Sequence, residues 1–569
     1  MTRNFLRWAV LASAVFSLAA CQDTLVVDNP NSGNTDKVLA TPADAENLLG
    51  SYYKRWHSGV YGSIGSAESM ANIFAFQTYS SLANECMNSH APFTGAGFTN
   101  TPGNTCQSNK YRLYSIGSEV NRVASSFLAK LAPGTGYTLG TTARDLRARA
   151  FAEFLNGLSL GYIAMVYDSA GIVSAGTDAE DAGPLYAYTQ VRDSALAAFD
   201  RAILAAQDAA AGGAGGFPLP STWIPSPTTF SATEFVKLVK SYRARIRANV
   251  ARTPAERATV DWTAVIADAD GGITATHQIT TNTVTGPVMS WRAQYSTFGL
   301  WHQMPPFFIG MADTSGSYAS WIAAAVGSRA SAGGSPFGMA TPDLRFPQGA
   351  SRAAQQADFA LTQCSGAANT PCKRYFVNRP TANDQTTGEG WGLSQYDFAR
   401  FYNWYLKGDA GTGQNGATPL FTLEEIQLLK AEGLYRAGNY AAAGAIVNTT
   451  RTRNGLAAIT TFNATTAVPG GNACVPKVPV APNYNTIGCG TLWDALKYEK
   501  RIETAFTHFM PWYLDARGWG DLAENVPLFL ATPYQDIQAR GKPNSAIYGT
   551  GPGVGNAPNS SAARSVYGW

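Results

Sequence analysis

Two helical segments joined by a tight turn constrain the fold of this chain more than any other feature. The segments Thr422–Ala437 and Ala441–Arg453 carry small and apolar residues at helical spacing. Small residues such as Ala431 and Ala443 let the two helices approach closely, and Gly438 is suited to end the first helix. A single pair of this kind cannot bury its apolar face alone. We therefore expect neighbouring helices to stack on it and supply the core.

The same helical spacing recurs upstream. The segments are Thr142–Val166, Tyr188–Ala206 and Ser231–Ala251, the last with a shorter partner at Trp262–Ala269. In the 422–453 pair the order of residues, with Tyr440 packing the turn, matches the tetratricopeptide repeat. We predict a mainly α protein with divergent helical repeats over about 142–272 and 422–453, separated by long insertions rather than stacked as a regular solenoid.

A long segment at roughly 280–415 separates the repeats and shows little periodicity. Such a segment inside a folded chain is usually functional or disordered. It is rich in Gly, Ser, Thr and aromatic residues, and its aromatic content argues against disorder. The chain is expected to close, over 492–569, with a helix at Leu492–Leu514, which Pro511 ends or kinks, and an irregular tail.

The N-terminus carries the signals of export. Arg3 and Arg7 precede a nearly apolar run at residues 8–20, which is shorter than the about 20 residues that a membrane span needs. The sequence Leu18-Ala19-Ala20-Cys21 resembles the bacterial lipobox, in which the cysteine is acylated and becomes the first mature residue. The alternative is an ordinary signal peptide with a cysteine at its end. We expect a signal peptide at 1–20 and a lipid anchor on Cys21.

Beyond this run, no apolar segment approaches a membrane span in length. Residues 21–40 are polar and are interpreted as a lipidated tether. Thr41 is suited to cap a helix that has Pro42 in its first turn. We predict a single domain over 41–569.

The other six cysteines form three pairs that are close in sequence, namely Cys86 with Cys106, Cys364 with Cys372 and Cys474 with Cys489. Six cysteines allow 15 pairings, and the sequence alone does not choose among them. The simplest pairing joins the cysteines that are close in sequence, and disulfides fit an oxidising compartment outside the cytosol. A metal site is disfavoured because there is no Cys-x-x-Cys and no histidine adjoins a pair.

The charge balance argues against a nucleic-acid partner. The formal net charge is +3, and removal of Arg3 and Arg7 with the signal peptide would leave +1, with no basic cluster. Charged residues make up 14% of the chain, well below the usual quarter, while 13 Trp and 26 Tyr are present. This composition suits an extracellular binding surface, and it equally suits a large core with uncharged loops.

The chain resembles the SusD/RagB family, the surface lipoproteins of nutrient uptake in Bacteroidetes-type bacteria. Six stretches carry the resemblance besides the lipobox: Asn29–Asn31, Ala43–Glu46, Ala148–Gly171, Glu425–Asn439 continuing to Val447–Leu456, Tyr498–Phe506, and Trp512–Gly520. Their order and spacing agree along almost the whole mature chain. The resemblance implies a SusD-like fold for the 41–569 domain, with tetratricopeptide-type helix pairs and an irregular ligand-binding region.

The resemblance also implies a role. Such proteins cap a SusC-like TonB-dependent transporter in the outer membrane, capture oligosaccharides or peptides, and deliver them to the barrel beneath. They catalyse no reaction, and we expect no cofactor and no metal. The tetratricopeptide side would face the transporter and the irregular side the ligand. The expected location is the outer membrane, lipid-anchored and exposed on the cell surface.

Two departures from the family pattern limit what can be transferred. After Phe506 the family usually has an acid-Gly-x-Arg stretch, whereas this chain has Thr507-His508-Phe509-Met510-Pro511. The 280–415 insert matches no member closely enough to transfer ligand residues. The resemblance therefore does not identify the ligand.

One acid pair invites a catalytic interpretation. Glu499 and Glu503 are four residues apart and share a helix face, and retaining glycosidases need two carboxyl groups about 5–5.5 Å apart. The alternative is that the acids and Arg501 serve internal ion pairing, as the resemblance implies. We favour ion pairing, because motif spacing alone has a high false-positive rate.

Aromatic residues are the candidates for ligand contact, because an aromatic face is a natural platform for the C–H face of a sugar. The richest run is Trp291, Tyr295, Phe298 and Trp301, whose helical offsets equally predict core packing, the favoured role for Phe298. Trp321 and Trp391 are comparable candidates. Trp56 and Tyr61 belong to the N-terminal part, which lines the ligand site in the family.

Two rival functions remain. A tetratricopeptide scaffold for protein–protein assembly in the envelope would have regular repeats and an exposed apolar groove, and the aromatic, disulfide-containing insert argues against it. A secreted hydrolase would need a titratable cluster in a cleft, and the chain has few histidines and no recognisable acid pair beyond Glu499 and Glu503.

Overall fold

The structure is a computed structural model of the whole chain, which divides into two units, Met1–Ala45 and Glu46–Trp569. The described residues are 41–63, 65–78, 100–104, 108–177, 183–212, 215–295, 304–324, 336–364, 371–381, 394–406, 413–523 and 526–542. In the first unit, the Thr41 hydroxyl accepts a hydrogen bond from the Asp44 N–H (3.2 Å), which confirms the predicted helix start. The signal peptide and tether lie outside the described residues.

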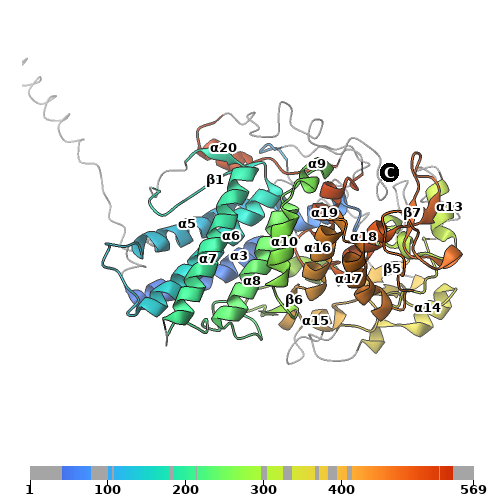
Figure 1. Cartoon of the computed structure of the whole chain (residues 1–569), viewed down its shortest axis with the longest axis horizontal. Helices are drawn as coiled ribbons and strands as arrows, with labels where there is room; N and C mark the ends of the chain where they lie inside the picture. The colour runs from blue at the N-terminus through green and yellow to red at the C-terminus, as the bar shows by residue number, and fades with distance from the viewer. Residues whose placement is uncertain are drawn as a thin grey trace, which may run out of the picture. The chain divides into compact units, whose positions relative to one another are not determined.

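Helices dominate the described residues (Figure 1). The longer ones are α3 (Pro42–Tyr61), α5 (Ser108–Lys130), α6 (Thr142–Val166), α7 (Tyr188–Ala211), α8 (Ala232–Asn249), α10 (Trp262–Asp270), α16 (Leu423–Arg436), α17 (Tyr440–Arg453), α18 (Leu492–Glu503) and α19 (Pro511–Trp519). Shorter ones are α4 (Ala67–Phe74), α9 (Pro254–Ala258), α11 (Ser290–Tyr295), α12 (Pro306–Ile309), α13 (Ser317–Ala323), α14 (Arg352–Asp358), α15 (Tyr402–Leu406) and α20 (Tyr534–Ala539).

The predicted helix pairs are confirmed and stack in series. Helix α6 packs against α7, α8 against α10, and α16 against α17, and α10 joins the second pair to the third (Figure 1). The bounds follow local signals, because the side chains of Thr141, Thr422 and Asn439 accept the N-cap hydrogen bonds of α6, α16 and α17. Gly438, at φ +77°, makes the turn between α16 and α17.

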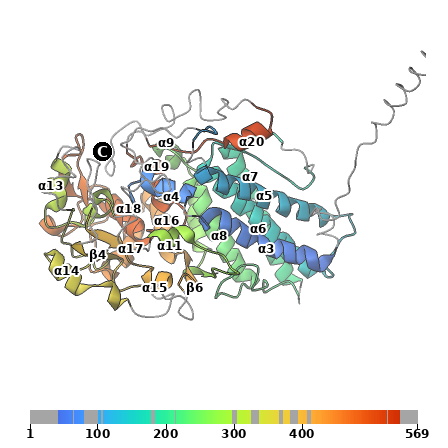
Figure 2. The same cartoon turned by 180° about the vertical axis from the view of Figure 1, so that it is seen from behind.

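Helix α6 is the centre of the N-terminal half. It packs against α5, α7 and α8 (Figure 2). From Ala148 onward almost every residue of α6 is buried. Phe154 shows the density of this core, since its ring lies edge-on to Phe235 with centroids 5.3 Å apart. A second core forms around α16, α17 and α18 from residues such as Leu428, Val447 and Leu496.

Four two-stranded antiparallel sheets occur among the described residues. They pair β1 (Ser169–Gly171) with β2 (Leu185–Ala187), β3 (His277–Thr281) with β6 (Gly416–Phe421), β4 (Phe376–Asn378) with β5 (Tyr396–Phe398), and β7 (Lys477–Pro479) with β8 (Ile487–Cys489). Because β3 and β6 flank the predicted 280–415 insert, their pairing brings its two ends together. The insert therefore leaves the helical body and returns to it at one place.

The C-terminal part differs from the prediction in one respect. The single helix expected over Leu492–Leu514 is two helices, because α18 ends at Glu503 and α19 begins at Pro511. Pro511 occupies the first turn of α19, where its missing N–H costs nothing. The expectation that Pro511 ends or kinks this helix is therefore wrong, because α18 already ends at Glu503 and Pro511 instead begins α19.

Candidate functional site

Four of the candidate ligand aromatics lie in the interior. Trp56 is 1% exposed and packs edge-on against Tyr162, with ring centroids 5.0 Å apart. Tyr61 and Trp291 are fully buried, with centroids 6.1 Å apart. Trp321 is 7% exposed. Other side chains cover these four rings in the structure, as the helical offsets around Trp291 allowed, and their ligand role stays a prediction.

The other candidates are not placed. Tyr295 ends α11, and the structure describes its backbone alone. Phe298, Trp301 and Trp391 lie outside the described residues. The ligand roles of Tyr295, Trp301 and Trp391, and the core role of Phe298, stay predictions.

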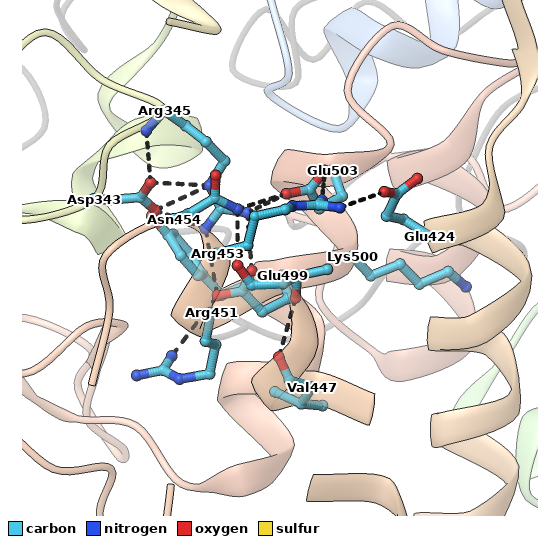
Figure 3. A network of polar contacts seen from close by, with 12 residues as sticks. Asp343, Arg345, Glu424, Val447, Arg451, Arg453, Asn454, Glu499, Lys500 and Glu503 are labelled. Carbon is cyan, nitrogen blue, oxygen red and sulfur yellow. Dashed lines mark hydrogen bonds and ion pairs between the residues drawn. The ribbon is translucent and has the colours of Figure 1, made fainter. Parts of the chain in front are cut away.

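The acid pair of α18 belongs to a buried ion-pair network (Figure 3). Arg345 Nη1 donates to Glu499 Oε2 at 2.9 Å and to Glu503 Oε1 at 3.1 Å. Arg345 also pairs with Asp343, and Glu503 with Arg453 at 3.1 Å. The network therefore joins α17 and α18 to the segment that carries Asp343 and Arg345.

The electrostatics of this pair superficially suit acid–base chemistry. Burial raises the pKa of Glu499, whereas at Glu503 burial is outweighed by Arg345, Arg400 and Arg453, which lower the pKa. Opposite shifts are what a glycosidase pair needs. However, both carboxylates are fully buried and accept hydrogen bonds from protein groups, so no substrate reaches them. The internal ion pairing expected from the sequence is present.

Two of the three local cysteine pairs are disulfides in the structure. Cys364 bonds to Cys372 and Cys474 bonds to Cys489, and the paired cysteines are 8 and 15 positions apart in the sequence. The Cys474–Cys489 bridge pins the loop before α18 to the core formed by α16, α17 and α18. The Cys86–Cys106 pair lies outside the described residues.

A buried histidine lies beside the aromatic residues of α3. The His57 ring packs against Tyr61 with centroids 4.7 Å apart, and neither of its nitrogens has a hydrogen-bond partner among the described residues. Burial, with smaller contributions from Arg292 and His277, lowers the pKa of His57 to about 3. The ring is therefore neutral in the folded protein at every pH near physiological.

His57 should make the protein acid-sensitive. Its folded pKa lies below its unfolded value of 6.5, so the unfolded chain binds a proton first and stability is lost as the pH falls below that value. Between about pH 7.5 and about pH 5.5 this histidine should cost about 1.4 kcal/mol of unfolding free energy. Urea titrations of the wild type and His57→Phe at both pH values should show that the variant loses about 1.4 kcal/mol less unfolding free energy than the wild type between the two pH values. Equal losses of unfolding free energy in the two proteins would contradict the lowered pKa of His57.

The surface pockets lined by described residues include two beside α7. One, of about 400 Å³, lies between the start of α7 and the end of α8. Its charged residues have partners of their own, since Arg192 pairs with Asp193, Arg247 with Asp268, and Glu256 accepts from the Arg252 N–H. Asp261, the remaining charged residue of the lining, accepts from the Ala264 N–H, so each of these groups has a partner within the protein.

The second pocket, here named the α5–α7 groove, has a volume of about 460 Å³. Its lining comes from Asn121, Ser125 and Leu128 of α5, Arg149, Glu153, Asn156 and Leu160 of α6, Ser194, Ala197, Ala198 and Arg201 of α7, and the segments 132–133 and 172–175. The groove was not predicted from the sequence, because α5, which forms one of its walls, was not predicted. Polar residues at helical spacing within the apolar 142–166 segment were the available signal.

Among the described residues, no group of three or more His, Cys, Asp or Glu side chains gathers in a way that could hold a metal ion. Within the same part of the chain, no helix combines the length and apolarity needed to cross a membrane.

Comparison with solved structures identifies the fold. A chitin-binding SusD homolog from Flavobacterium johnsoniae superposes with a TM-score of 0.52 at 10% identity, over 92% of this chain and 98% of that one. A SusD superfamily protein from Parabacteroides distasonis has a TM-score of 0.52 at 8% identity, over 88% and 98%. No family model and no curated protein matches the sequence.

These similarities show that the chain has the SusD-like fold, a mainly α architecture of tetratricopeptide-type helix pairs with a long insert. The fold expected from the sequence resemblance is thereby confirmed. It extends over nearly the whole length of both comparison proteins.

Proposed function

We propose that this protein is a SusD/RagB-type binding protein that captures oligosaccharides at the cell surface and delivers them to a SusC-like TonB-dependent transporter. The observation that carries the proposal is the SusD-like fold, shared over almost the full chain with a chitin-binding homolog. Peptides are the second ligand class, in keeping with the RagB branch. The anchor would be a lipid on Cys21, which follows the apolar run at residues 8–20.

The proposal includes no catalytic step. The one acid pair that resembled a glycosidase site is buried among arginines. We place the ligand site in the 280–415 insert, where β3 and β6 hold both ends at the helical body. Trp301 and Trp391 are the proposed ligand residues there, because the four candidates whose side chains the structure describes are buried.

A glycan and peptide array probed with purified Gln22–Trp569 tests this function. The expected result is binding to a family of related oligosaccharides, with Trp301→Ala or Trp391→Ala lowering the signal by at least about tenfold. Tyr137→Ala, in a partly exposed loop ahead of α6, is the matched control and should bind as the wild type does. Circular dichroism of all variants excludes unfolding as the cause of a lost signal.

The alternative outcomes separate the rival functions. Oligosaccharide binding that survives both tryptophan variants would keep the uptake role and move the site. Binding to peptides alone would select the peptide branch. Silence towards all ligands, together with pull-down of periplasmic proteins, would replace the proposal with the envelope scaffold.

A further inference from the structure

The floor of the α5–α7 groove is a polar stripe in the middle of α6, where most of the surrounding residues are apolar. Arg149, Glu153 and Asn156 are spaced four and three residues apart, so they share one face of α6. Glu153 and Asn156 are only 6% and 5% exposed, although most of the neighbouring residues of α6 are apolar. Buried polar groups are the informative exception in a protein interior. Both have partners in the groove wall, since Asn156 Oδ1 accepts from Asn121 Nδ2 at 2.8 Å and Glu153 pairs with Arg201.

The walls of the groove are held in place before any ligand arrives. Asn121 Oδ1 accepts a hydrogen bond from the Val173 N–H at 3.0 Å, and Ser125 Oγ donates to the Val173 carbonyl at 2.9 Å. These bonds fix the segment 172–175 across one end. On the opposite wall, Ser194 and Ala197 of α7 have small side chains, which leave space between α7 and α5. The groove needs no rearrangement to admit a ligand.

The charges that line the groove do not balance. Arg201 Nε and Nη2 donate to the two oxygens of Glu153 at 2.7 and 2.9 Å, which neutralises that pair. Arg149 donates from Nη2 to the Leu131 carbonyl at 2.6 Å and forms no ion pair with any described carboxylate. Because no other charged residue lines the groove, one positive charge remains uncompensated. Guanidinium groups bind carboxylates with well-directed hydrogen bonds.

We propose that the α5–α7 groove binds a small ligand that carries a carboxylate. The carboxylate lies against Arg149 and the outer side of Arg201, and Asn156 and Ser194 contact neighbouring hydroxyl or amide groups. The volume falls within the range of about 300–1,000 Å³ that is usual for small-ligand sites. No aromatic ring lines the groove, so it lacks the platform that a neutral sugar would use.

Two classes of small ligand carry such a carboxylate, namely uronic acids and amino acid derivatives. The site is separate from the 280–415 insert and does not depend on the proposed function. If the insert binds no glycan, the groove proposal still stands. If the groove binds no carboxylate, the proposed function of the insert is unaffected.

Calorimetric titration of Gln22–Trp569 with galacturonate, N-acetylglycine and neutral galactose tests the groove. We expect binding of at least one carboxylate and none of galactose, and the carboxylate that binds identifies the source. Ala197→Leu should block the groove and weaken binding at least about tenfold. Ala197 is exposed, so this variant should fold normally. Ala210→Leu, at an exposed position of α7 that does not line the groove, is the matched control and should bind normally.

Arg149→Met supplies the charge test, because it keeps the apolar stem and removes the guanidinium. It should also weaken carboxylate binding at least about tenfold. If this variant fails to fold, Ala197→Leu still decides the question. Carboxylate binding unchanged in Ala197→Leu, binding of galactose as strong as of galacturonate, or no carboxylate binding at millimolar concentration would each overturn the proposal.

Discussion

Replacement of Arg257 by alanine should lower the free energy of unfolding by about 3–5 kcal/mol, because it leaves buried carboxylates without their partner. Arg257, in α9, is fully buried. Its Nε and Nη2 donate to Glu432 of α16 at 2.9 and 2.6 Å, and Nη2 also donates to Asp515 of α19 at 2.9 Å. One guanidinium thus connects three elements that are distant in sequence.

The electrostatics explain why the loss should be large. Burial by itself would raise the pKa of Glu432, but the adjacent Arg257 outweighs it and holds that pKa at about 2. Glu432 is therefore ionised in the folded protein, and without Arg257 its charge would stay buried beside weaker partners. Arg436, at 2.9 Å, is partly exposed, so it cannot replace a buried guanidinium.

The measurement is urea unfolding of Arg257→Ala beside the wild type at neutral pH. The matched control is Arg55→Ala, which removes the arginine of an ion pair with Glu119 whose side chains are 45% and 38% exposed. An exposed pair of this kind contributes at most about 1 kcal/mol. Similar small losses in the two variants would show that Arg257 does not hold these elements together.

The sequence predicted the repeat helices well, because their signals are local. Helix α6 has the predicted bounds, and α16 begins directly after its Thr422 cap. These segments carry caps and regular apolar spacing, which need no knowledge of the rest of the chain. The insert boundaries were also near the observed β3–β6 pairing, because the loss of periodicity marks where the helical body ends.

What the sequence could not supply depends on contacts between distant segments. Helix α5 was missed because its sequence contains Gly117 and many serines, and its burial depends on α6. The partners of Arg257 are also distant, since Glu432 lies 175 residues away. In the candidate site, the spacing around Trp291 fitted both a core and a ligand platform, and only tertiary packing placed that ring inside.

Substitution of Gly161 by alanine should lower the free energy of unfolding by about 1–3 kcal/mol through overpacking between α6 and α8. A Cβ at this position would clash with Ile246 Cδ1 and lie 3.0 Å from its Cγ1. Ile246 is fully buried, so its side chain has no free space into which to move. The absence of a side chain at Gly161 thus permits the close approach of α6 and α8. The sequence alone does not reveal this role, because it shows only a glycine within an apolar helix.

Chemical denaturation of four variants, Gly161→Ala among them, isolates this clash. Gly103→Ala, in a turn, is the control for a glycine with free space around it, since nothing lies within 4 Å of a Cβ there, and it should be close to neutral. Ile246→Val removes the clashing Cδ1 and alone should cost about 0.5–1.5 kcal/mol. Combined with Gly161→Ala, it should cost less than the sum of the single losses, because the cavity in one variant accommodates the methyl group of the other. Strict additivity, or a Gly161→Ala variant as stable as the wild type, would mean that α6 and α8 can move apart, and the close approach would then not be a determinant of this fold.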